Sequence, residues 1–196
     1  MLTRLERLLR RQNGKRAAGP LQPADPSFGL NLLENAHGDD IEIFLVAARH
    51  AAALGQAPWI LRDRAHLDTL GRALAFTLQY GLWLQRNDMG VEHWQGQLLA
   101  LRPSGAPPIG LVLACRPDDE AAWQLRFFCI DTPWLGKGYG ARLLRAARRS
   151  LSGVPLHARL PLCCVAAVKS LEAAGFQRMH VDATDIASFE APAEWD

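Results

Sequence analysis

Residues 125–151 read LRFFCIDTPWLGKGYGARLLRAARRSL and contain three successive patterns. An apolar run rich in aromatic and branched residues, 125–130, is typical of a strand. Gly136, Gly138 and Gly140 then alternate with other residues, and the amphipathic stretch 141–151 predicts a helix. Glycines let the backbone approach an anion closely, and a helix start directs its N–H groups and positive dipole end at the same point. This strand, turn and helix therefore predict a pyrophosphate-binding site.

Three kinds of phosphate-binding turn differ in the residues around them. A P-loop requires Gly-Lys followed by Ser or Thr, whereas Lys137 is followed by Gly138. The dinucleotide pattern Gly-x-Gly-x-x-Ala is met by Gly136, Gly138 and Ala141, but that fold needs an acidic residue about 20 positions later, and 132–171 contains none. The third kind holds coenzyme A, whose anionic groups suit an acid-free basic zone. This zone comprises Lys137, Arg142, Arg145, Arg148, Arg149 and Arg159.

The same segment resembles the CoA-binding signature of the GNAT superfamily of acyl-CoA-dependent N-acyltransferases. Residues 127–130 match its strand and 136–140 match its turn, and AVKSLEAAGF at 167–176 is similar to the helix and Gly-Phe step that close the family's fold. The resemblance covers roughly residues 90–190. It implies an α/β (α+β) fold with a central mixed, mostly antiparallel sheet flanked by helices. Residues 57–196 would form the acyltransferase domain, and 1–56 a helical N-terminal extension with a linker.

The resemblance also implies a function and a site. The protein would transfer an acetyl or other acyl group from acetyl-CoA or a related thioester to an amine of a small-molecule or protein acceptor. The backbone amide of Ile130 would stabilise the thioester oxygen, which makes Ile130 the expected catalytic position. The residues expected to bind CoA are Ile130, Leu135, Gly136, Lys137, Gly138, Tyr139, Gly140, Ala141 and Cys164.

Four positions depart from the family pattern. Leu135 stands where an Arg or Gln is usual, Cys164 replaces an Asn, Leu171 replaces the Tyr that often acts as general acid, and Gln124 replaces a Glu that often acts as base. Candidate replacements for the base are Glu92, His93, Glu120 and His157, with Tyr80 for the acid and Trp83 and Trp134 as pocket walls. The missing groups keep a second hypothesis open, a non-catalytic GNAT-fold module that binds CoA or a protein partner.

The composition is that of an ordinary globular protein. The 196 residues are 49% hydrophobic and 21% charged, and the net charge of +2 argues against a nucleic-acid-binding surface. No apolar run is long enough to span a membrane and the N-terminus lacks a signal-peptide core, so we expect no membrane contact and a cytoplasmic location. The four cysteines lack zinc spacing, which predicts reduced thiols and no metal. The excess of Arg over Lys indicates a bacterial, GC-rich genome.

Outside the signature, hydrophobic periodicity predicts the remaining elements. Leucines at helical spacing near the N-terminus, beside arginines, predict a short helix that packs on the core or on a second copy of the chain in a homodimer. Pro and Gly mark 12–27 as a linker. Further helices are expected at 40–54 and 66–85, and one at 165–171, striped by Val165, Val168 and Leu171, which Gly175 ends. Strands are expected at 58–62, 94–101, 109–115, 123–130, 156–160, 176–181 and 185–190, those from 94 to 130 forming an antiparallel meander.

Overall fold

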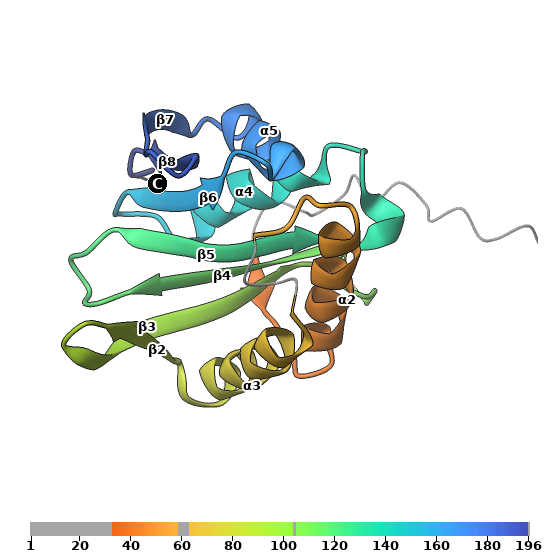
Figure 1. The fold of residues 1–196 in the computed structure, drawn as a ribbon, viewed down its shortest axis with the longest axis horizontal. Coiled ribbons are helices and arrows are strands. Elements are labelled where there is room, and N and C mark those ends of the chain that lie inside the picture. The colour runs from red at the N-terminus through yellow and green to blue at the C-terminus, as the bar shows by residue number, and fades with distance from the viewer. Residues whose placement is uncertain (1–32, 59–62, 104, 196) are drawn as a thin grey trace, which may run out of the picture.

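The computed structural model describes residues 33–58, 63–103 and 105–195. One sheet with the strand order β1-β3-β4-β5-β6-β8-β7 forms the centre, and β2 pairs with β3 outside this path. The strands are β1 (Glu34–Asn35), β2 (Leu82–Asn87), β3 (Gly90–Leu101), β4 (Gly110–Arg116), β5 (Trp123–Ile130), β6 (Leu156–Pro161), β7 (Gln177–Val181) and β8 (Ile186–Ala191). The helices are α2 (Asp40–Ala53), α3 (Arg64–Tyr80), the 3₁₀ turn η2 (Thr132–Trp134), α4 (Tyr139–Ser150) and α5 (Val165–Ala173). Figure 1 shows α2 and α3 on one side of the sheet, with α5 beside β6.

The strand pairing confirms the predicted mixed, mostly antiparallel sheet. β3, β4 and β5 form the expected antiparallel meander, and β6, β8 and β7 pair antiparallel as a second group. These two groups meet at β5 and β6, which are parallel. The parallel pair places α4 in the crossover between its strands, as the sequence of strand, turn and helix requires.

Helix α3 begins and ends at recognisable capping residues. The Asp63 side chain accepts a hydrogen bond from the His66 N–H at 3.3 Å at the start of α3, and Gly81 ends the helix with φ 66°. The predicted helix over 66–85 was therefore wrong in its last residues, because the left-handed glycine stops it and Leu82 opens β2. The predicted helix over 40–54 is confirmed as α2.

The sheet separates two layers of buried side chains. Phe44 of α2 and Leu74 of α3 pack with Leu111 and Leu113 of β4 on one side. On the other side, α4 and α5 bury their apolar stripes against β4, β6 and β8. In the predicted α5 stripe Val168 and Leu171 are buried, whereas Val165 is exposed. Each helix pair therefore packs on one face of the sheet, with α2 and α3 over β2 to β5.

Some predictions concern the beginning of the chain. The amphipathic N-terminal helix, the 12–27 linker and most of the predicted 58–62 strand lie outside the described residues. A domain boundary at residue 57 stays a prediction, although β1 pairs with β3 and α2 packs on the sheet. Within the described ranges, no helix is both long and apolar enough to cross a membrane.

Candidate active site

The turn between β5 and α4 has the backbone geometry of an anion-binding turn. Gly136 and Gly138 have φ angles of 73° and 81°, which L side chains rarely adopt, and Gly138 is the N-cap of α4. A Cβ added at either glycine would meet nothing within 4 Å, so the turn faces open space. The first α4 hydrogen bond runs from the Arg142 N–H to the Gly138 carbonyl at 3.3 Å. The Gly140 and Ala141 amides precede it and have no acceptor within the helix, which suits them to an anion.

Gly140 has a different role in the same turn. A Cβ at this position would lie 2.3 Å from the Ser170 Oγ and 3.0 Å from the Ser170 Cβ. Real Cβ contacts essentially never come that close to another heavy atom, so only glycine fits. The residue thus lets the first turn of α4 lie directly against α5.

A gap between β5 and β6 leads to this turn. β5 and β6 pair at three positions, the last being Leu125 with Ala158. At the same place the β4–β5 register shifts, because Ala114 faces Leu125 while Leu113 faces Phe127. Arg126 is therefore the extra residue of a β-bulge, and a bulge bends the strand that carries it. The bend separates β5 from β6 along the rest of β5.

The end of β5 directs a main-chain donor into this gap. Ile130 is paired with Gly110 of β4, and the next residue, Asp131, donates its N–H to the Ile109 carbonyl of the β4 side at 2.8 Å. Successive residues of a strand point their N–H groups to opposite sides. The Ile130 N–H is thus directed away from β4, which is the orientation needed to reach a ligand between β5 and β6.

The turn, the end of β5 and α5 enclose a cavity of about 440 Å³. All of the predicted CoA-binding residues except Lys137 line it. Lys137 instead places its ammonium 5.2 Å from the centre of the Trp134 ring at the cavity mouth. Tyr139 also lines the cavity, and its buried side chain packs edge-on against Trp134. The lining residues are Gln56, Phe128, Cys129, Ile130, Trp134, Leu135, Gly136, Gly138, Tyr139, Gly140, Ala141, Cys164, Ala166, Ala167, Lys169, Ser170 and Ala173.

One wall of the cavity was missed by sequence reasoning. Ala166, Ser170 and Ala173 stand on α5 at spacings of four and three residues, so they share one face of the helix. This run of small side chains was visible in the sequence and would have indicated a close approach by a ligand or by another helix. Gln56, which follows α2, had no such signal.

The predicted basic zone is only partly assembled. Lys169 is the one charged side chain among the described lining residues, and the lining contains no carboxylate. Arg145 and Arg148 donate to the Ala173 and Ala174 carbonyls at 3.0 and 2.9 Å, where they cap α5. Arg159 pairs with Asp182 at 3.1 Å. The zone predicted from sequence is therefore divided between ligand-facing and structural cations.

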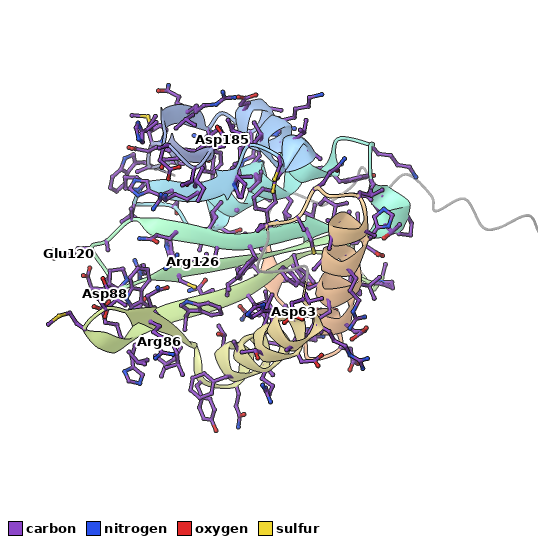
Figure 2. The ribbon with its side chains drawn as sticks, in the orientation of Figure 1. Asp63, Arg86, Asp88, Glu120, Arg126 and Asp185 are labelled. Atoms are coloured by element: carbon purple, nitrogen blue, oxygen red, sulfur yellow. The ribbon has the colours of Figure 1, made fainter. Side chains whose placement is uncertain are left out.

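The candidate acids and bases do not meet at this cavity. Glu120 lies in the turn between β4 and β5, away from Arg126 in the middle of the sheet (Figure 2). His157 pairs across the sheet with Gln124, six residues before Ile130. Glu92 and His93 lie on the exposed first half of β3. None of the four lines the cavity within the part of the chain that the structure describes.

The acid position is vacant as well. Leu171, the position at which the sequence resemblance would place a Tyr, is fully buried in the core. Tyr80 is 56% exposed at the end of α3 and stacks on Phe76. Of the two tryptophans predicted as pocket walls, Trp134 lines the cavity, whereas Trp83 packs against Phe127 on the α2/α3 side.

Burial holds the cavity thiol Cys129 in its neutral form. Desolvation raises the pKa of Cys129 to about 12, and it raises the pKa of Cys115 on β4 to about 12. A thiolate is the nucleophilic form, so neither residue is suited to form a covalent intermediate near neutral pH. No group of three or more metal-ligating side chains occurs among the residues with described positions.

Comparison with known proteins identifies the fold. No protein-family model and no curated relative matches the sequence. Among solved structures, spermidine N-acetyltransferase from Vibrio cholerae, in complex with CoA and spermine, is similar with a TM-score of 0.59 and 12% identity over 82% of this chain and 94% of that one. A GNAT-superfamily phosphinothricin acetyltransferase from Sinorhizobium meliloti, with acetyl-CoA, gives 0.58 and 13% over 84% and 89%. Aminoglycoside acetyltransferase AAC(6')-Ib, with paromomycin and acetyl-CoA, gives 0.57 and 15% over 82% and 92%.

These likenesses confirm the fold predicted from the turn and the Gly-Phe step. The chain has the GNAT fold, in which the bent strand β5 beside the α4 turn borders the open region of the sheet. At 12% to 15% identity the likeness concerns the fold, and the chemistry has to be argued from the site itself.

Proposed function

We propose that this protein transfers an acyl group, with acetyl-CoA as donor, to an amine. The observation that carries the proposal is the continuity of one cavity from the glycine turn at the start of α4 to the Ile130 N–H at the end of β5. The solved structures with this fold that contain CoA or acetyl-CoA support the same ligand. Bound there, the donor would supply an acyl group activated as a thioester.

The cavity residues fit coenzyme A at both of its ends. Gly136 and Gly138 leave open space for a pyrophosphate, and the Gly140 and Ala141 amides would donate to it. Lys137 at the mouth and Lys169 on α5 supply positive charge without a competing carboxylate in the lining. The gap beside β5 accepts an extended arm, which main-chain groups of that strand can hydrogen-bond as they would a neighbouring strand.

Positioning would supply most of the rate enhancement. The Ile130 N–H points into the gap, where it would donate to a carbonyl oxygen and stabilise the negative charge that develops on it. The amine nitrogen would bond to the acyl carbon and the carbon–sulfur bond would break. The proton lost from the nitrogen would be taken up by the leaving thiolate, so that an amide and the free thiol of CoA result. With no side-chain base lining the cavity among the described residues, the amine would enter in its neutral form. We therefore expect kcat/KM to rise with pH through the pKa of the amine itself.

A titration of the protein with acetyl-CoA, free CoA and NAD by calorimetry tests the donor site. We expect binding of both CoA species and none of NAD. Gly138→Asp adds a negative charge in the open turn and should weaken acetyl-CoA binding at least about tenfold. Gly138→Asn has the same shape without the charge and should weaken it less. Gly153→Asp is the matched control, since Gly153 also has a positive φ and open space but lies past the other end of α4. Equal affinities in all of these variants would refute the assigned site.

One observation favours a second function, a CoA-binding module without catalysis. Leu171 is fully buried where the resemblance places a general acid, and none of the four candidate bases lines the cavity of the described structure. Incubation with acetyl-CoA and a mixture of primary amines, followed by mass spectrometry, separates the two. N-acetylated products above the no-protein background support the transferase, and tight CoA binding without any product supports the module.

A further inference from the structure

Arg126 is a half-buried arginine at the point where the sheet opens, and none of the described residues forms an ion pair with it. It is the bulge residue of β5, and it lines two cavities, one on each side of the last β5–β6 pair. Its Nη2 donates to the Gln85 Oε1, its plane lies 5.1 Å from the centre of the Trp94 ring, and its Nε is buried without a hydrogen-bond partner. The contacts described for this residue include no acidic side chain.

Arg116 shows what is missing at Arg126. Arg116 also lies over a tryptophan, Trp123, and its Nε donates to a glutamine, Gln95, at 2.9 Å. There the arrangement is completed by Asp119, whose carboxylate is 2.6 Å from the Arg116 Nη2. The same three-part arrangement at Arg126 has its tryptophan and glutamine but lacks the carboxylate.

Two other half-buried arginines in the described chain have acidic partners. Arg102 pairs with Asp40 and Glu34, and Arg148 pairs with Glu194 at 2.9 Å. Near Arg126, the acid bonded to the Trp94 indole is Glu92, which accepts at 2.9 Å and bonds Asn87 with its other oxygen. A desolvated cation is costly unless an anion compensates it, so Arg126 is suited to bind an anion from outside the chain.

The charges around Arg126 also favour the binding of an anion. Burial lowers the pKa of Arg126, the nearby Cys115 opposes that shift, and the positive charge of Arg159 adds to it. Arg159, which pairs with Asp182, lines both of the cavities that Arg126 lines, whereas the Glu190 carboxylate lines only the cavity over β6 and β8. The other cavity, between β5 and α2, has no carboxylate among its described lining residues, so the anion would meet a second cation there. A polycationic acceptor would instead be repelled by both residues.

The cavities beside Arg126 connect along β5 with the donor cavity. One of them, the cavity between β5 and α2, is lined by Leu125 to Cys129. It shares the lining residues Phe128, Cys129 and Gln56 with the larger cavity at the glycine turn. Ile130 lies four positions after Arg126, which corresponds to about 13 Å of extended backbone. An acceptor held by its anion at Arg126 would therefore need several bonds between that anion and the amine that reacts near Ile130.

We propose that the amine acceptor carries a carboxylate, which Arg126 binds, at a distance of several bonds from the reacting amine. This assignment of the acceptor class rests on the proposed acyltransferase function. Arg126 would be a specificity-determining residue that touches the acceptor and leaves donor binding unaffected. The acceptor class would thus be short peptides or ω-amino acids with a free carboxylate.

The binding part of the proposal can be tested without turnover. We would follow the Arg126 Nε–H resonance by ¹⁵N NMR while acetate is added, and assign it by its loss in Arg126→Gln. Acetamide is the uncharged control for acetate. We expect a saturable shift with acetate and none with acetamide. The Nε–H of Arg116 should not shift, because it already donates to Gln95 and the same guanidinium is paired with Asp119. An Arg126 resonance that responds to neither probe, or equally to both, overturns the proposal.

The specificity part uses a length series of amines with acetyl-CoA. Glycine, 6-aminohexanoate and 8-aminooctanoate would be compared with their carboxamides and with spermidine. We expect kcat/KM for the longer ω-amino acids to exceed that for their carboxamides by about tenfold or more, because one charge-assisted pair is lost in the amide. Arg126→Gln should remove this preference, while Arg116→Gln should keep it and both should bind acetyl-CoA as the wild type does. Equal rates for acids and amides, or faster acetylation of spermidine, overturn the proposal.

The two proposals fail in different ways. If no amine in the series is acetylated, the transferase function is refuted, and an acetate-dependent shift at Arg126 would still support a carboxylate site. If amines are acetylated and the carboxylate has no effect in wild type, the transferase stands and the Arg126 assignment is wrong.

Discussion

Close packing between Gly140 of α4 and Ser170 of α5 predicts a strong energetic coupling. An alanine at position 140 would place its Cβ 2.3 Å from the Ser170 Oγ and 3.0 Å from the Ser170 Cβ. Rotation of the hydroxyl relieves the first contact only, since the second joins two atoms fixed to the backbones. Overpacking of this kind costs about 1–3 kcal/mol, while alanine regains about 1 kcal/mol of helix propensity. Gly140→Ala alone should therefore lower the unfolding free energy by about 0–2 kcal/mol.

A double-mutant cycle isolates the packing contribution. Ser170→Gly removes the opposing Cβ, so the helix-propensity effects of the two single variants cancel in the cycle and the coupling energy equals the overpacking cost. We expect a coupling of about 1–3 kcal/mol from urea denaturation of the four proteins. Gly71→Ala on α3 is the matched control. Its Cβ would meet only the end of the flexible Leu45 side chain, with Cδ1 at 3.2 Å and Cδ2 at 3.9 Å, so the substitution should be neutral or stabilising. A Gly140/Ser170 coupling below about 0.5 kcal/mol would show that the helices shift apart freely and would refute the reasoning.

Three further changes test the packing and ionisation of single residues. Phe44→Ala should lower the unfolding free energy by about 3–5 kcal/mol in urea denaturation, because Phe44 is 2% exposed and joins α2 to Phe127, whereas Val46→Ala on the exposed side of α2 should change it by less than about 0.5 kcal/mol. Hydrogen bonds from the Thr184 hydroxyl and from the Ile186 and Thr184 amides lower the pKa of Asp182 to about 2, so an NMR titration of this carboxyl should have its midpoint near pH 2. The stability that the ionised Asp182 contributes should be lost as the pH falls from 4 through 2, and Asp182→Asn should lack this pH-dependent contribution. A midpoint near the ordinary value of 3.8 would contradict the network. Iodoacetamide at pH 7.5 should modify exposed Cys163 and spare Cys129, whose pKa is raised to about 12 by burial, and peptide mass spectrometry showing equal labelling would contradict that burial.

Sequence patterns predicted the elements around the glycine turn because local rules govern them. Branched and aromatic runs marked β3, β4 and β5, and alternating glycines marked the start of α4. The end of α3 was placed too late, although Gly81 is a glycine at the position of a helix cap. β1 pairs through only two residues, which is too short to produce a periodic signal.

The candidate site was predictable as far as it depends on neighbouring residues. The turn and its helix are continuous in sequence, so nearly all the expected residues were found around one cavity. Arg126 was not singled out, because a charge within an apolar strand has no meaning until its surroundings are known. Its partner Gln85 lies 41 positions away, and its lack of a carboxylate depends on how β2, β3 and β5 are placed beside one another.

The opening between β5 and β6 leaves part of a strand edge unpaired without exposing that edge at the perimeter of the sheet. A strand edge at the perimeter of a sheet attracts other chains and promotes aggregation. Here the bulge at Arg126 creates an edge in the interior, where β6, α2 and α5 flank it. Such an edge is open to a thin, extended molecule and closed to a second sheet. Recognition by main-chain groups and protection from self-association therefore arise from the same bend in one strand.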